Sequence, residues 1–190
     1  MGGTIGVTRV RKDHQRRKRR LRDAIADESG ATIVEFAFVV APFIALILAI
    51  LVTMLVFFAQ QALETAGEAA ARLVFTGQAQ QNGWSASQYK TQVCTHLPPI
   101  LSCSKLMVDV ETVASFSAAS TAAPTITYDA SGNPIMPYQA GGAGNIVIVR
   151  LMYLWPVATG PMGFNLGNQA GTNNRLLIAT SVAQTEPYTS

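Results

Sequence analysis

The stretch "ESGATIVEFAFVVAPFIALILAILVTMLVFFAQ", residues 28–60, contains an apolar run that decides the class of fold. From Phe36 to Ala59 it has 24 residues without a charged side chain. About 20 consecutive apolar residues cross the hydrocarbon core of a bilayer as a helix. A secretory signal peptide has a shorter apolar stretch and a small-residue cleavage site, which the sequence after Ala59 matches poorly. We therefore predict a transmembrane helix over residues 31–59, in which Pro42 is tolerated.

The charges on either side of this run predict its orientation. Residues 1–30 hold nine Lys/Arg and four Asp/Glu, a net of +5, whereas residues 31–190 hold five and seven, a net of −2. Positive flanks stay in the cytoplasm, so we expect a single membrane pass with the N-terminus inside and the chain from about residue 60 outside. A basic run such as residues 9–22 also occurs in nucleic-acid-binding proteins. Beside a membrane span it is better explained as a topology determinant, and we expect no nucleic-acid partner.

The rest of the chain is predicted to form an extracytoplasmic α+β domain over residues 79–190. Residues 60–78 continue the first helix, with Gly77 as its C-cap, and residues 84–94 form a second helix. Alternating or β-branched stretches predict strands over residues 105–116, 145–155 and 175–184, and "YDASGNP", residues 128–134, indicates a hairpin. The simplest arrangement that buries the apolar faces of both is a small antiparallel sheet packed on the distal half of the long helix.

The two cysteines, Cys94 and Cys103, are separated by eight residues, a spacing that fits no CxxC metal or redox motif. Outside the cytoplasm a disulfide between them is favoured, because oxidising compartments preserve such bonds. The alternative is a pair of small buried side chains.

Residues with catalytic chemistry are scarce in this sequence. His14 and His96 have no partner at metal-ligand spacing, and no glycine-rich phosphate loop is present. Asp109 and Glu111 alternate with valines along one predicted strand, and we expect both to be solvated. We therefore predict no enzyme activity, no cofactor and no metal site.

Glu35 is the unusual residue, because an ionisable group beside a membrane span is costly and has a partner or a function. Gly30 precedes it by five residues and a basic leader precedes both, which resembles the type IV prepilin cleavage signal. The resemblance implies that a prepilin peptidase cuts on the cytoplasmic side after Gly30. Cleavage would remove the leader, residues 1–30, and leave Ala31 as the new N-terminus.

The stretch "GATIVEFAFVVAPF", residues 30–43, further resembles the start of TadE-like pseudopilins of the tight-adherence (Flp/Tad) type IV pilus. The matching positions are Gly30, Val34, Glu35, Phe36, Ala37 and Pro42. Major Flp pilins have tyrosine where this chain has Phe36, and they consist of little more than the helix. The resemblance therefore implies a pilin-like minor pilin or pseudopilin that takes part in pilus assembly or adhesion. Its implied partners are other pilins, the Tad assembly platform and the peptidase, and its implied location is the bacterial inner membrane.

Charge pairing supplies a physical role for Glu35. After cleavage, its carboxylate can neutralise the α-amino group of Ala31 in a neighbouring subunit. At ~4 Å and an effective dielectric near 20 this attraction is ~4 kcal/mol before desolvation. The alternative is a glutamate at the membrane edge that reaches cytoplasmic water. In that case the protein would be an uncleaved, signal-anchored extracytoplasmic binding protein.

Overall fold

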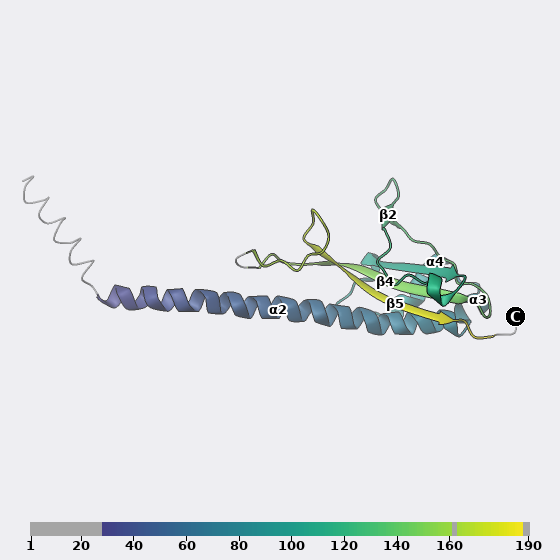
Figure 1. Cartoon of the computed structure of the whole chain (residues 1–190), viewed down its shortest axis with the longest axis horizontal. Helices are drawn as coiled ribbons and strands as arrows, with labels where there is room; N and C mark the ends of the chain where they lie inside the picture. Colours follow the sequence, from purple (N-terminus) through teal and green to yellow (C-terminus); the bar gives the residue numbers. More distant parts are fainter. Residues whose placement is uncertain (1–27, 161–162, 188–190) are drawn as a thin grey trace, which may run out of the picture. The chain divides into compact units, whose positions relative to one another are not determined.

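The computed structural model describes residues 28–160 and 163–187. The chain forms two compact units, Met1–Ile47 and Leu48–Ser190, and helix α2, Glu28–Phe75, contributes residues to both (Figure 1). The other elements are the helices α3 (Gln78–Gln81) and α4 (Ala86–Thr95), the 3₁₀ turns η1 (Cys103–Lys105) and η2 (Phe116–Ala118), and the strands β1 (Leu106–Val113), β2 (Thr127–Tyr128), β3 (Pro134–Ile135), β4 (Ile146–Pro156) and β5 (Asn174–Gln184). The predicted α+β class, with a long apolar helix and a small antiparallel sheet, is confirmed.

Helix α2 is continuous because its sequence offers few interruptions. No glycine occurs between Gly30 and Gly67, and most positions carry Ala, Leu or other apolar residues. The helix ends where Gly77 takes a left-handed backbone conformation with φ of 76°, which a residue with a Cβ rarely adopts. The Gly77 N–H donates to the carbonyl of Val74 at 3.0 Å and satisfies one of the last helical acceptors.

The main sheet has the strand order β1-β4-β5, and both neighbouring pairs are antiparallel. In its register Val110 lies opposite Val149, and Leu151 lies opposite Ala179. Strands β2 and β3 form a separate hairpin at the predicted position around residues 128–134. Beyond β5, the Glu186 N–H donates to the carbonyl of Phe75 at 2.7 Å, so the end of the last strand lies beside the end of α2.

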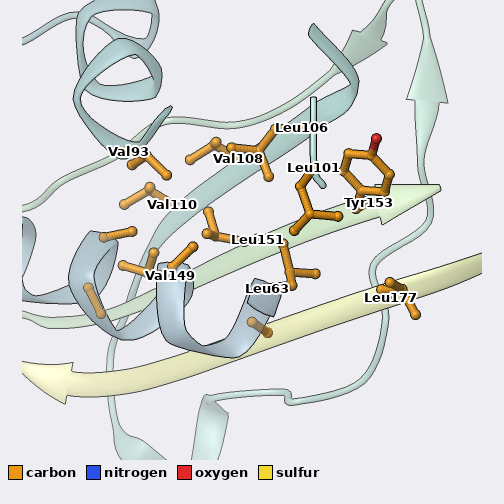
Figure 2. Close-up of a cluster of buried hydrophobic side chains, with 14 of the residues drawn as sticks. Leu63, Val93, Leu101, Leu106, Val108, Val110, Val149, Leu151, Tyr153 and Leu177 are labelled. Carbon is orange, nitrogen blue, oxygen red and sulfur yellow. The ribbon is translucent and has the colours of Figure 1, made fainter. Parts of the chain in front are cut away.

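One face of the sheet packs on the second part of α2. The buried helix positions follow a spacing of three or four residues, as expected for a helix that presents one face to a core. This stripe consists of Val56, Ala59, Leu63, Ala66, Ala70 and Val74, and Ala71 beside it is also buried. Figure 2 shows Leu63 of α2 in one cluster of buried side chains with Leu151 and Val149 of β4 and Val110 of β1. Most of the helix residues in contact with the sheet are small, so the two layers approach closely.

Helix α4 closes one side of this core. It begins with a capping box in which the Ser85 side chain accepts from the Gln88 N–H and Gln88 accepts from the Ser85 N–H. The Tyr89 ring is fully buried, and its hydroxyl donates to the carbonyl of Ala70 at 2.7 Å. Desolvation by burial raises the pKa of Tyr89 far above its ordinary value. The second helix predicted over residues 84–94 is therefore present and packs on α2.

The packing of α2 begins earlier than the predicted end of the membrane span. Val56 and Ala59 belong to the core formed with the sheet, although both fall within the residues 31–59 assigned to the bilayer. Apolar side chains are equally compatible with lipid and with a protein core, so composition alone does not mark the change between them. The burial of Val56 and Ala59 in the second unit shows where α2 begins to pack on the sheet.

Candidate functional site

The first part of α2 carries the residues that the sequence singles out. Its large apolar side chains are exposed, including Ile33 (70% exposed), Phe36 (68%) and Phe38 (77%). Within the described residues α2 is the one helix long and apolar enough to cross a membrane, by length and composition. Exposed apolar surface of this extent is stable in lipid or against other apolar helices. The first part of α2 therefore has the properties of a membrane anchor, and the described residues leave its apolar side chains uncovered.

The predicted cleavage site lies in the first turn of α2. Gly30 is exposed, and an added Cβ at this position would meet no described atom within 4 Å. Ala31 follows within the same helix. The backbone around the Gly30–Ala31 bond is therefore uncrowded by the residues that the structure describes. The basic run of residues 9–22 lies outside those residues.

Glu35 and Phe36 are neighbours on α2 and point in different directions, because successive helical residues are rotated by about 100°. Both side chains are exposed. Position 35 lies one helical turn beyond position 31, a rise of about 6 Å along the axis. The carboxylate thus lies within one turn of the amine that cleavage would create. Among the described residues Glu35 has no ion pair.

The family model described as TadE-like protein matches residues 30–72. Residues 30–72 are TadE-like. The resemblance drawn from the first residues of α2 is confirmed, and it extends along nearly the whole helix. No curated protein and no solved structure matches the chain.

The TadE-like segment begins at Gly30, the residue predicted to precede the cleaved bond, and ends three residues before the end of α2. It therefore includes both the exposed apolar part of the helix and the stripe that packs on the sheet. The sheet itself, β1, β4 and β5, lies outside the matched residues. The match thus covers 43 of the 190 residues and describes this segment as TadE-like.

Cys94 and Cys103 form a disulfide, with their Cα atoms 5.6 Å apart. The bond joins α4 to the turn η1, which leads directly into β1. It therefore fixes the helix next to the first strand. His96 is exposed between the two cysteines. The described residues contain no group of three or more His, Cys, Asp or Glu side chains that could hold a metal ion.

The expectation that Asp109 and Glu111 are solvated is wrong for Asp109, which is 1% exposed. Arg150 on β4 lies opposite it in the sheet and donates to its carboxylate at 2.5 Å and to Glu111 at 2.9 Å. The same guanidinium donates to the carbonyl of Ser120 at 2.9 Å. This hydrogen bond holds the segment after β1 next to Arg150. Desolvation by burial raises the pKa of Asp109, and the hydrogen bond from Arg150 opposes that shift. The cluster is a structural support, and the alternating strand pattern did not indicate it.

Proposed function

We propose that this chain is a minor pilin or pseudopilin that a prepilin peptidase cleaves after Gly30 and that takes part in Tad pilus assembly or adhesion. The observation that carries the proposal is the start of the TadE-like match at Gly30, five residues before Glu35. The same glycine follows a leader with a net charge of +5. Such a leader holds the N-terminus in the cytoplasm, where the peptidase acts.

Assembly through α2 follows from its exposed apolar side chains, which point to different sides of the helix. Neighbouring TadE-like or pilin helices on more than one side would cover Ile33, Phe36 and Phe38. Glu35 would then face the α-amino group of Ala31 on one of those neighbours. A buried ion pair adds little net stability, but a misaligned neighbour leaves both charges unpaired. Glu35 therefore sets the axial register between helices.

The test is the N-terminal sequence of the protein extracted from membranes of cells with and without the prepilin peptidase. The proposal predicts a terminus at Ala31 only when the peptidase is present. An uncleaved N-terminus in both strains would contradict it. The chain would then be a signal-anchored protein whose function lies in the sheet domain.

A second readout separates processing from assembly. If the terminus is Ala31, cross-linking through a cysteine placed at the exposed Phe36 reports which pilins or platform proteins lie against α2. A cysteine at Gln61, exposed on the same helix beyond the apolar run, is the matched control. Cross-links specific to position 36 are expected. Equal labelling at both positions would argue against assembly through the apolar part of the helix.

A further inference from the structure

The cations of the sheet domain are unevenly placed. Residues 48–190 contain six Asp/Glu and five Lys/Arg, and those five are Arg72, Lys90, Lys105, Arg150 and Arg175. Arg150 is neutralised by Asp109 and Glu111 in the middle of the sheet. The other four form no ion pair within residues 28–160 and 163–187. Arg72 is exposed near the C-terminal end of α2, whereas Lys90, Lys105 and Arg175 lie in another part of the domain.

The strand register places Arg175 and Lys105 at one end of the sheet, which we call the basal end, and a shared pocket places Lys90 of α4 there too. Arg175 lies opposite Trp155, at the junction where β4 leaves the sheet and β5 enters it. Lys105 immediately precedes Leu106, which pairs with Tyr153 two residues earlier on β4. At the opposite end of the sheet lie the end of β5 and Glu186, beside the C-terminal end of α2.

Two of the cations share a pocket of about 480 Å³ at this end. Its lining includes Lys90, Lys105, Tyr128, Asn133 and Asn174. Burial lowers the pKa of Lys90, as expected for an ammonium that loses water without gaining a counter-charge. The pocket thus combines two ammonium groups with hydroxyl and amide donors, the chemistry that binds a phosphate group.

Two described acids lie near the basal end: Glu64 of α2, which accepts from Gln60 at 2.7 Å, and Asp129, in the turn between β2 and β3. The Asp129 neighbours Tyr128 and Asn133 line the pocket. Backbone N–H groups of Ser131 and Asn133 donate to the Asp129 carboxylate, each at 2.8 Å, and the hydrogen bonds lower its pKa. Asp129 therefore stays charged but is already hydrogen-bonded within its own turn. With three cations against these two anions, the described residues of the basal end have a net charge of +1.

The basal end also lies beside the part of α2 where the bilayer would end. A second pocket, of about 170 Å³, is formed by Thr53, Phe57 and Gln60 of α2 together with Leu166 and Arg175. A span of about 20 residues that begins near Ile33 ends near Val52. Arg175 and its neighbours are then at the depth of the lipid headgroups. Trp155, half-buried next to Arg175, belongs to the residue type enriched at that depth.

We propose that the basal end rests on the membrane surface and binds anionic phospholipids, with Lys90, Lys105 and Arg175 contacting lipid phosphates. This inference rests on the membrane anchor of the proposed function. Charge complementarity identifies the partner, because a positive surface beside a membrane span meets the negative headgroups first. Arg175 already donates from Nη1 to the carbonyl of Leu166 at 3.0 Å, which leaves its other nitrogens for lipid. The expected consequence is a fixed height of the domain above the bilayer.

The chain provides its own probes for a test, because it has two tryptophans. Trp155 lies at the basal end, whereas Trp84 follows α3 and donates its backbone N–H to Ala79, near the C-terminal end of α2. The full chain is reconstituted in vesicles of phosphatidylcholine, with or without phosphatidylglycerol, that contain lipids brominated near the headgroup. The Trp84→Phe variant then reports on Trp155, and the Trp155→Phe variant reports on Trp84.

Phosphatidylglycerol is expected to increase the quenching of Trp155 and to leave Trp84 unchanged. Replacing Lys90, Lys105 and Arg175 by glutamine should abolish the increase, with the docked-to-undocked ratio falling about fivefold for each cation removed. The matched control is Arg72→Gln, which removes an exposed cation from the other end of the domain and should retain the full effect.

Alkaline extraction of the same vesicles separates failure of this inference from failure of the membrane anchor. A chain that resists extraction but shows no phosphatidylglycerol effect at Trp155 would overturn the lipid contact and leave the proposed function standing. The same conclusion follows if the triple glutamine variant behaves like Arg72→Gln. A chain released by alkali would overturn both, because the basal end would then have no membrane beside it.

Discussion

Gly67 of α2 lies so close to Ala179 of β5 that a Cβ atom at position 67 would come within 2.9 Å of the Ala179 Cβ. This distance is shorter than ordinary carbon contacts, so the absence of a side chain at Gly67 sets the spacing between helix and sheet. The same position would favour alanine if helix propensity alone mattered. Packing against β5 explains why glycine occupies the middle of a long helix.

We predict that Gly67→Ala destabilises the domain by about 1–3 kcal/mol, the usual cost of overpacking a close-packed core. Denaturant unfolding monitored by tryptophan fluorescence measures this change. In the double variant Gly67→Ala/Ala179→Gly the conflicting methyl group is gone, so most of the loss should be recovered. A Gly67→Ala variant more stable than the parent protein would show that the layers separate at little cost.

Replacing Arg150 should destabilise the protein, because it leaves the buried Asp109 carboxylate without its ion-pair partner. In Arg150→Met the Asp109 carboxylate loses its counter-charge, and breaking a buried pair in this way costs about 3–5 kcal/mol. Because burial raises the folded-state pKa of Asp109, the protonated form is favoured on folding. The contribution of protonated Asp109 to the free energy of unfolding is therefore present at acidic pH, and it is lost as pH rises through the folded-state pKa of Asp109.

Unfolding of Arg150→Met across the acidic range measures this dependence. The variant should lose more stability with rising pH than the parent protein, since Arg150 opposes the shift in the parent. Adding Asp109→Asn removes the titrating group and should flatten the extra dependence. An Arg150→Met variant with the pH profile of the parent protein would show that Asp109 is not the group responsible for the pH dependence.

The disulfide should stabilise the domain through the short loop that it closes. A loop of about ten residues corresponds to roughly 3 kcal/mol in the chain-entropy model. We expect reduction to lower the denaturation midpoint of the parent protein and to leave Cys94→Ala/Cys103→Ala unchanged. Equal sensitivity of both proteins to the reductant would indicate an effect unrelated to this bond.

Glu35→Ala should leave membrane insertion and cleavage largely intact while it impairs pilus assembly. The reason is that the α-amino group of Ala31 would lose its acidic partner only when helices associate. Electron microscopy of pili, together with N-terminal sequencing of the variant, distinguishes assembly from processing. Glu35→Asp, which keeps the charge, should assemble better than Glu35→Ala, and normal piliation in Glu35→Ala would contradict the pairing role.

The elements of the fold could be predicted from sequence because their patterns are local. The apolar run gave α2, the β-branched stretches gave β1, β4 and β5, and the glycine and proline residues around positions 128–134 gave the hairpin. The glycine and glutamate at positions 30 and 35 likewise gave the TadE-like resemblance that the family match confirms.

Features that depend on distant partners could not be predicted in the same way. Asp109 follows the pattern of a half-exposed strand, yet it is buried because Arg150, 41 residues away, and the segment at Ser120 cover it. Gly67 could be taken for a weak point in a helix until the position of Ala179 is known. The basal end likewise joins cations from α4, η1 and β5, which the strand register and the packing of α4 bring together.

The contact between α2 and β5 has a consequence for biosynthesis. The Gln60 side chain donates to the carbonyl of Ile178 at 2.9 Å, across a sequence separation of 118 residues. The stripe of α2 around Gly67 therefore stays uncovered while the intervening chain is translated, because its partner strand emerges much later. During that interval the nascent domain exposes apolar surface that a chaperone could hold until β5 arrives.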